Sequence, residues 1–310
     1  MRTLLFLFTA CALVACGGGG DQGGDAPADT AEPAADAAPA GPDPDSPSAR
    51  LENVLASQPA EVRDRYPFRH PQATLEFFGI EPGMTVVEAL PGGGWYTKIL
   101  LPYLGPEGRL IGADYALDMY RNFDFGTDEF IANKRTWTTD WPAEARGWAG
   151  EDAAAVDAFV FGNLPADMHG TADAVLIIRA LHNLARFEDD GGYLTQALDD
   201  AFAVLKPGGI AGVVQHHARD DMPDSWASGE NGYLKESFVI TAMQSAGFEL
   251  VDSSDINANP ADRPTTEDIV WRLPPSLGTS EADTDLRAQL EAIGESNRMT
   301  LLFRKPRPAN

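Results

Sequence analysis

A glycine-rich segment and an acidic residue have the types and order expected of a nucleoside-binding site. The segment runs from Glu88 to Gly94 with the sequence Glu-Ala-Leu-Pro-Gly-Gly-Gly, and Asp114 ends the next apolar run of the chain. Glycines lack a Cβ, so the backbone of such a loop can approach a ligand closely. An acid that ends the second strand of an open α/β sheet can accept hydrogen bonds from the hydroxyls of a ribose. These residues predict a site for a nucleoside-containing cofactor.

The loop favours S-adenosyl-L-methionine over a dinucleotide. A dinucleotide fingerprint needs glycine or alanine three residues after its second glycine, and Thr97 stands at that position. Glu88 precedes the loop and would lie unfavourably close to a pyrophosphate. S-adenosyl-L-methionine presents an amino group and a sulfonium cation instead. We therefore expect this cofactor, and a nicotinamide-dependent reductase is the less favoured alternative.

Histidines follow two apolar runs in the second half of the chain. His182, with Arg179 and Asn183 nearby, is the first candidate for a catalytic base or a substrate-orienting group. His216 and His217 follow the next run, and side chains alternate along a strand, so one of the two should face the cleft. His216 is the better candidate. The alternative for His182 is packing against the cofactor or capping of the following segment, and the alternative for His216 is a structural hydrogen bond.

Metal and thiol chemistry are not expected. The two cysteines of the chain, Cys11 and Cys16, both lie in the leader described below, so the remaining domain has no thiolate nucleophile and no zinc-thiolate site. The three histidines, together with Asp220, could hold a metal by residue type, but spacing alone does not fix ligand geometry. We predict no metal.

Alternating strands and helices must position these residues. The expected strands are 84–89, 109–114, 156–161, 174–178, 210–214, 248–251 and 298–304, and the expected helices are 94–104, 193–205 and 234–246. This alternation predicts an α/β fold, with a mostly parallel sheet covered by helices on both faces. The Pro-rich stretch 255–297 is too long for a plain connection. It is interpreted as an insertion that either lines the substrate mouth, through Asp262 and Arg263, or forms a surface excursion.

Several motifs together resemble class I S-adenosylmethionine-dependent methyltransferases and, more narrowly, a family of exported bacterial methyltransferases. The resemblance covers about residues 60 to 306. It rests on the segments 82–88, 91–97, 181–183, 205–209 and 259–262 and on Arg298-Met299. The string Pro-Gly-Gly-Gly-Trp-Tyr at 91–96 is fairly specific, whereas Lys-Pro-Gly-Gly at 206–209 occurs throughout class I enzymes. The resemblance implies a Rossmann-like, seven-stranded sheet whose last strand is antiparallel, with the cofactor across the ends of the first two strands.

The resemblance also implies methyl transfer to a small substrate and assigns roles to particular residues. The cofactor-binding set is Glu88, Pro91, Gly92, Gly93, Gly94, Tyr96, Asp114, Asn163 and Arg179, and the catalytic candidates are His182 and His216. Two positions depart from the class I pattern. Leu90 replaces the first glycine of the general loop, and Gly162-Asn163 replaces an acid that many of these enzymes place after the third strand. The adenine would then be held by backbone N–H groups and the amide of Asn163.

Aromatic and basic residues before and after the loop could close over the cofactor. Tyr66, Arg69 and His70 could form an N-terminal lid that excludes water. The alternative is that Tyr66 packs in the core and Arg69 pairs with a surface acid. Trp95 and Tyr96 could flank the cofactor, although Trp95 could equally lie in the core.

The N-terminal residues predict export and lipid anchoring. Residues 1–16 combine one positive charge, an apolar run and Leu-Val-Ala-Cys, which resembles a lipoprotein signal with lipidation at Cys16. An ordinary secretory signal is the alternative. Residues 17–50 lack aromatic residues, Leu, Ile and Val and are expected to form a disordered tether. Residues 51–310 would form the enzyme domain, held in the cell envelope on the periplasmic side of the outer membrane.

The net charge of −24 excludes some partners. An acidic surface repels nucleic-acid phosphates, so nucleic acid is not an expected partner, and contact with a membrane is expected through the lipid anchor alone. A small-molecule substrate is expected. A non-catalytic binding or scaffold protein is the alternative function, because export separates the chain from the cytoplasm, where S-adenosylmethionine is made. The sequence does not predict the oligomeric state.

Overall fold

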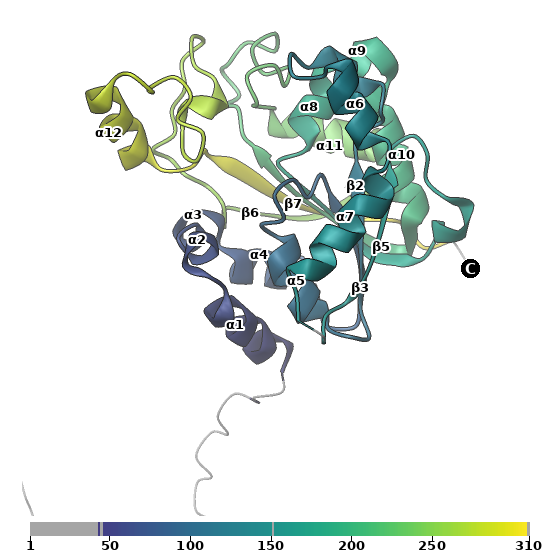
Figure 1. Cartoon of the computed structure of the whole chain (residues 1–310). Coiled ribbons are helices and arrows are strands. Elements are labelled where there is room, and N and C mark those ends of the chain that lie inside the picture. Colours follow the sequence, from purple (N-terminus) through teal and green to yellow (C-terminus); the bar gives the residue numbers. More distant parts are fainter. Residues whose placement is uncertain (1–42, 44–45, 151, 309–310) are drawn as a thin grey trace, which may run out of the picture. The chain divides into compact units, whose positions relative to one another are not determined.

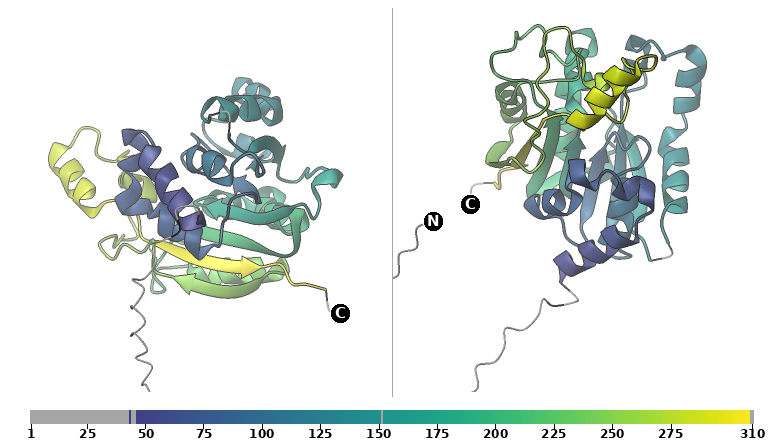
Figure 2. Two further views of the ribbon diagram at one scale, coloured as in Figure 1. Left: turned by 90° about the horizontal axis from the view of Figure 1, so that it is seen from below. Right: turned by 90° about the vertical axis from the view of Figure 1, so that its left-hand side faces the viewer.

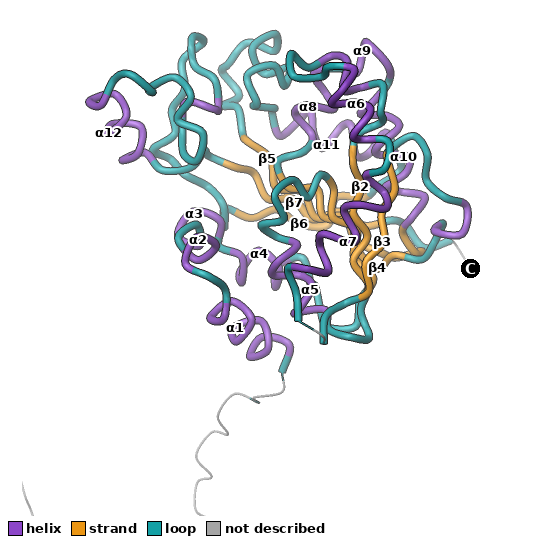
Figure 3. Tube along the Cα trace, in the orientation of Figure 1, coloured by secondary structure: helices purple, strands orange, loops and turns teal. Residues whose placement is uncertain are grey.

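The computed structural model describes residues 43, 46–150 and 152–308 (Figure 1). These residues form a seven-stranded sheet with the order β3-β2-β1-β4-β5-β7-β6, drawn in orange in Figure 3. The strands are β1 Thr85–Ala89, β2 Arg109–Asp114, β3 Ala155–Val160, β4 Ala172–Ile178, β5 Leu205–His216, β6 Glu249–Ser254 and β7 Arg298–Arg304. β1 to β5 are mutually parallel, and β7 is antiparallel to both of its neighbours. The predicted Rossmann-like α/β fold with an antiparallel last strand is confirmed.

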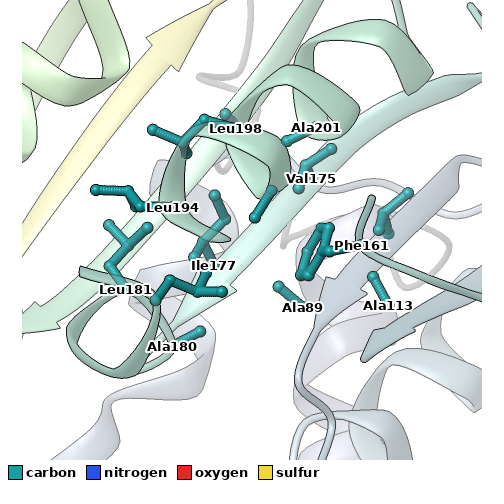
Figure 4. Close-up of a cluster of buried hydrophobic side chains, with 14 of the residues drawn as sticks. Ala89, Ala113, Phe161, Val175, Ile177, Ala180, Leu181, Leu194, Leu198 and Ala201 are labelled. Atoms are coloured by element: carbon teal, nitrogen blue, oxygen red, sulfur yellow. The ribbon is translucent and has the colours of Figure 1, made fainter. Parts of the chain in front are cut away.

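Each face of the sheet has its own apolar core, because successive strand residues point to opposite faces. Val86 and Leu110 belong to one buried cluster, which we call the first core, whereas Val87 and Ile111 belong to the second core. Figure 4 shows part of the second core, where Ile177 of β4 lies among leucines of two helices. The central strands are buried on both faces, and they therefore read as continuous apolar runs in the sequence.

Helices cover both faces (Figure 1). α1 Pro47–Ser57, α4 Pro71–Phe77, α5 Thr97–Leu104 and α7 Trp137–Gly147 contribute to the first core, and α8 Leu181–Arg186, α10 Tyr193–Val204 and α11 Glu236–Ser245 to the second. The remaining described helices are α2 Ala60–Arg63, α3 Tyr66–Arg69, α6 Asp128–Lys134, α9 Glu188–Gly191 and α12 Thr284–Ile293, with 3-10 turns at Met119–Asn122, Ala166–Met168 and Val270–Arg272. Among the described helices, none is both long and apolar enough to cross a bilayer.

Several element boundaries differ from the sequence expectation, and two of the differences have a clear physical reason. β5 begins at Leu205 rather than at 210, because the backbone of the predicted Lys-Pro-Gly-Gly turn is paired on both sides: Leu205 with Ala172, and Gly208 and Gly209 with Lys305. α5 begins at Thr97 rather than at 94, because Gly94 has a left-handed backbone.

The N-terminal boundary also differs. Helix α1 begins at Pro47, inside the stretch expected to be a disordered tether, and the Ser46 hydroxyl caps it by accepting the Ala49 N–H at 3.2 Å. The Arg50 guanidinium donates to the carbonyl of Pro102 at 3.0 Å. Apolar residues after position 50, such as the fully buried Leu51, extend the fold backwards into the polar stretch. The predicted signal peptide, Cys16 and residues 17–42 lie outside the described residues.

The predicted insertion at 255–297 contributes to two small apolar clusters. One is shared with residues 218–233 and contains Tyr233 and Val270, and the other contains Leu273 and Leu290. Figures 1 and 2 show α12 of this insertion and the N-terminal helices on the same side of the sheet. Asn257 joins these parts, because its amide donates to the hydroxyls of Thr74 in α4 at 3.0 Å and Thr300 in β7 at 3.1 Å.

Candidate functional site

Two strained residues mark the place where ligands bind in sheets of this kind. The chain winds from β1 to β2 in one direction and from β4 to β5 in the other, so the crevice outside the carboxyl ends of β1 and β4 is the topological switch point. Leu90 directly after β1 has φ 53°, and Arg179 directly after β4 has φ 58°. A left-handed non-glycine residue costs about 1–3 kcal/mol, and such residues cluster at functional sites. Both strained residues flank the switch point.

The three glycines of the loop differ in whether the backbone conformation or the surrounding space requires a residue without a Cβ. Gly92 has φ 54°, which side chains adopt rarely. Gly94 has φ 74°, and a Cβ there would lie 2.1 Å from the Trp148 ring. Gly93 has neither constraint, because its φ is ordinary and a Cβ would meet nothing within 4 Å. Folding alone does not require glycine at position 93, and the space beside it is open.

Glu88 lies beneath this loop. It is buried in β1 on the face of the first core, and it accepts a 2.7 Å hydrogen bond from the Thr97 hydroxyl at the start of α5. Burial raises the pKa of the Glu88 carboxyl to about 7, although the hydrogen bonds from Thr97 oppose this shift. The predicted cofactor ligand Glu88 therefore holds the loop against α5.

Asp114, at the end of β2, has a nearly complete set of partners within the chain. One carboxylate oxygen accepts the Tyr115 N–H at 2.9 Å and the Tyr120 hydroxyl at 2.8 Å. The other oxygen accepts from Lys134 of α6 at 2.7 Å. A carboxylate offers about four lone-pair positions, so Asp114 retains room for one further donor, and a second requires Lys134 to move.

The remaining predicted cofactor residues lie around the loop and along the same edge of the sheet. Asn163 is exposed after β3, and Pro91 is buried. Tyr96 is buried, and its ring packs edge-on against Trp95 at 4.7 Å between centroids. Burial raises the pKa of Tyr96, while the guanidiniums of Arg179 and its neighbours act in the opposite direction.

The two predicted catalytic histidines come together. The ring centroids of His182 in α8 and His216 at the end of β5 lie 5.4 Å apart. His182 is buried, and its Nδ1 lies 3.5 Å from the Gln215 amide, whereas His216 Nδ1 lies 2.6 Å from the Ser296 hydroxyl. Burial lowers the pKa of His182 to about 4 and that of His216 well below its usual value, and nearby positive charge adds to both shifts. Both rings are neutral at pH 7.

A cluster that the sequence did not predict lies beside these histidines. Glu295, 2% exposed, lies within 4.0 Å of four arginine side chains in the described part of the chain. The N–O distances are 3.3 Å to Arg65, 3.0 Å to Arg69, 3.8 Å to Arg179 and 2.6 Å to Arg298. We call these five residues the arginine cluster. Arg298 appeared in a sequence motif and Arg179 beside His182, but nothing in the sequence indicated that Glu295 would join them.

Arg69 and Tyr66, predicted as parts of a lid, are fixed in the structure. Arg69 is buried, and its guanidinium lies on Glu295 and 4.6 Å from the Trp95 ring centroid. The Tyr66 hydroxyl donates to the Leu55 carbonyl at 3.0 Å. His70 is exposed. Arg69 pairs with the buried Glu295, so the alternative that it pairs with a surface acid is wrong, and the lid stays a prediction.

The other sequence candidates lie apart from the histidine pair or serve the insertion. Asp262 is buried and accepts from Arg272 at 2.8 Å, whereas Arg263 is exposed. His217 forms an isolated bridge with Leu234. Asp220 is exposed. Within the described residues, no three histidine, cysteine, aspartate or glutamate side chains are placed to hold a metal ion.

Comparisons with known proteins show similarity at the level of the fold. The chain matches no protein-family model and no curated protein. Among solved structures, it resembles a SAM-dependent methyltransferase from Aquifex aeolicus, with 14% identity, a TM-score of 0.45, and coverage of 83% of this chain and 98% of the other. It also resembles the [4+2]-cyclase SpnF, with 18% identity, a TM-score of 0.45, and coverage of 84% and 93%.

A third similar structure is an arsenic(III) S-adenosylmethionine methyltransferase from Chlamydomonas reinhardtii. Its identity is 16%, its TM-score 0.43, and the match covers 84% of this chain and 74% of the other. Identities and TM-scores of this size do not establish a reaction. The function is therefore inferred below from the residues of this chain.

Proposed function

We propose that this chain is a lipid-anchored methyltransferase of the cell envelope that uses S-adenosylmethionine to methylate a small molecule. The observation that carries the proposal is Gly93. It has an ordinary backbone and open space beside it, yet it is glycine at the switch point of the sheet. Close approach of a ligand to the backbone accounts for a glycine that folding does not require. The motif resemblance at 91–97 supports the same cofactor.

The residues around the loop fit the parts of S-adenosylmethionine. The backbone at Gly92 and Gly93 would lie along its methionine end, Asp114 would accept a ribose hydroxyl, and Asn163 would face the adenine. The cofactor supplies an electrophilic methyl group: a lone pair of the substrate forms a bond to the methyl carbon as the carbon–sulfur bond breaks, leaving a neutral thioether.

The histidines are better suited to orienting the substrate than to taking its proton. A general base works best when its pKa lies near the operating pH, and the pKa of His182 is lowered to about 4. A neutral imidazole can still donate or accept a hydrogen bond to position a nucleophile. This arrangement favours a substrate whose attacking atom carries a free lone pair at neutral pH.

A binding protein without catalysis is the second candidate, and Asp114 favours it. Its carboxylate is already engaged by Tyr115, Tyr120 and Lys134. A site that no longer binds a nucleoside could retain these contacts for stability alone. Methyl transfer from S-adenosylmethionine to any acceptor would exclude this candidate.

Calorimetric titration of the full chain with S-adenosylhomocysteine, the demethylated cofactor, tests the proposal. We expect binding to the wild type and at least about tenfold weaker binding to Gly93→Ala, because the added methyl would occupy the ligand's space. Gly147→Ala is the matched control, since its Cβ also meets nothing within 4 Å, on helix α7. Denaturant unfolding should show both variants folded. Absence of wild-type binding would overturn the proposal.

A further inference from the structure

The arginine cluster carries more positive charge than its single carboxylate can balance. Four guanidiniums surround Glu295, and no second carboxylate lies within 4.0 Å of Arg69, Arg179 or Arg298 among the described residues. Glu295, Arg69 and Arg298 are all at most 5% exposed. Burying unbalanced charge is costly unless a partner neutralises it. This excess lies inside a chain whose overall charge is −24.

Other groups that face the cluster do not balance it. His182 and His216 are neutral at pH 7, and the guanidiniums contribute to their lowered pKa values. Tyr96 is also neutral, because burial raises its pKa. Two acids on neighbouring elements have partners of their own: Asp262 pairs with Arg272, and Asp114 pairs with Lys134. The described residues therefore leave the cluster with a net positive charge.

Arg179 is the member of the cluster with unused donors. Its contact with Glu295 is the longest of the four, at 3.8 Å, which is too long for a hydrogen bond. Its Nε is buried and has no hydrogen-bond partner among the described residues. A quarter of the side chain is exposed, compared with 2% for Arg298. The left-handed backbone at Arg179 holds this side chain at the end of β4.

We propose that Arg179 binds an anionic group of the substrate, a carboxylate or a phosphate, with Arg69 and Arg298 supplying further positive charge. A planar guanidinium fork suits either group, because both present paired oxygens. The assignment to the substrate rests on the proposed function. It also rests on position: the cluster lies at the end of β4 and the start of β7, where Ser296 contacts both Arg298 and His216, across the switch point from Asp114.

The test measures stabilisation of the full chain by inorganic phosphate and by acetate, each titrated at constant ionic strength against chloride. We expect a saturable rise in Tm with at least one of these anions. Arg179→Gln should weaken that binding at least about tenfold, the loss expected for a charge-assisted hydrogen bond. Arg121→Gln is the control, because Arg121 forms an exposed pair with Asp128. Whichever anion stabilises the protein identifies the preferred group.

Arg179→Gln should also keep, or raise, the Tm of the anion-free protein, because it removes an unbalanced charge. A purely structural arginine would instead lower the Tm when replaced, and that result would overturn the proposal. Equal anion effects in the wild type and Arg179→Gln, or no anion effect in the wild type, would overturn it as well.

A repeat of the titration with saturating S-adenosylhomocysteine separates this inference from the proposed function. If the anion still stabilises the protein, the site is distinct from the cofactor's own carboxylate, as we infer. If S-adenosylhomocysteine abolishes the anion effect, Arg179 binds the cofactor carboxylate and the substrate assignment is wrong. If S-adenosylhomocysteine does not bind at all, the proposed function fails, while the anion titration still decides whether Arg179 binds an anion.

Discussion

The two sides of the switch point are built in opposite ways. On the β1–β2 side, the charged groups have partners: Glu88 holds Thr97, and Asp114 holds Lys134 and two tyrosine groups. On the β4–β7 side, four arginines share one glutamate, and Arg179 has a buried nitrogen that finds no partner in the described part of the chain. The first side offers open backbone to a ligand, and the second offers unused positive charge.

This difference indicates which side discriminates between ligands. On the β1–β2 side, the glycine loop and Asp114, whose carboxylate already has most of its hydrogen-bond partners, can bind a nucleoside of suitable shape with little change in the protein. An unbalanced positive charge increases the affinity for a ligand of opposite sign. It lowers the affinity for other ligands, because the buried charge stays unpaired when they bind. Substrate specificity is therefore expected on the β4–β7 side.

The largest expected effect concerns Glu295. Glu295→Gln removes the single carboxylate from the arginine cluster and should lower the free energy of unfolding by about 3–5 kcal/mol, as breaking a buried ion pair does. Urea denaturation of the full chain measures this loss. Adding Arg179→Gln to Glu295→Gln should recover part of it, because one repelling charge disappears. Equal stability of wild type and Glu295→Gln would show that the arginine cluster does not need the Glu295 charge for its stability.

The next largest effects are two opposing pH dependences of the free energy of unfolding, one on each side of the switch point. The Glu88 pKa is raised from 4.5 to about 7, so its contribution to stability is complete below pH 4.5 and is lost as pH rises through 7. The His182 pKa is lowered from 6.5 to about 4, so its contribution is complete above pH 6.5 and is lost as pH falls through 4. Each shift corresponds to about 3 kcal/mol.

Single glutamine variants should separate these contributions in urea denaturation series from pH 4 to 8. Glu88→Gln should become more stable relative to the wild type as pH rises above 5. His182→Gln should lose less stability than the wild type as pH falls below 6.5. In the wild type, the two slopes oppose each other between pH 4.5 and 6.5. Parallel profiles for wild type and variants would contradict the assigned pKa directions.

The smallest expected effect concerns Lys134, which occupies one oxygen of Asp114 at 2.7 Å. The side chains of Lys134 and Asp114 are 24% and 9% exposed, so Lys134→Ala leaves a buried carboxylate oxygen without its donor and should lower the free energy of unfolding by about 1–3 kcal/mol. If a ribose hydroxyl must displace Lys134, this variant should bind S-adenosylhomocysteine up to about fivefold more tightly. Weaker calorimetric binding would show instead that Lys134 orients Asp114 for the ligand.

The sheet could be predicted from the sequence because its signals are local. Strands β2 and β7 have the predicted bounds, since alternating or continuous apolar runs mark both ends clearly. Helix α1 was not predicted, and its first residues were assigned to the tether, because its stabilising contacts come from the distant carbonyl of Pro102 and from Leu51 and Leu55 further along the same helix. Composition alone could not indicate those contacts.

The candidate site could be predicted only where neighbouring strand ends bring residues together. The meeting of His182 and His216 follows from strand order, because β4 and β5 are adjacent and parallel. The arginine cluster could not be predicted, since it joins α3, β4, β7 and the insertion across 226 positions between Arg69 and Glu295. Such contacts depend on tertiary packing of segments that carry no shared motif.

The most direct test of the proposed cofactor site is a crystal structure of the full chain grown with S-adenosylhomocysteine. We expect electron density for its amino-acid end against the backbone of Gly93 and for its ribose against Asp114, at the carboxyl ends of β1 and β2. We also expect that Arg179 remains free of the cofactor carboxylate. Density for the ligand elsewhere, or a Gly93 backbone that no ligand approaches, would contradict the proposed cofactor site.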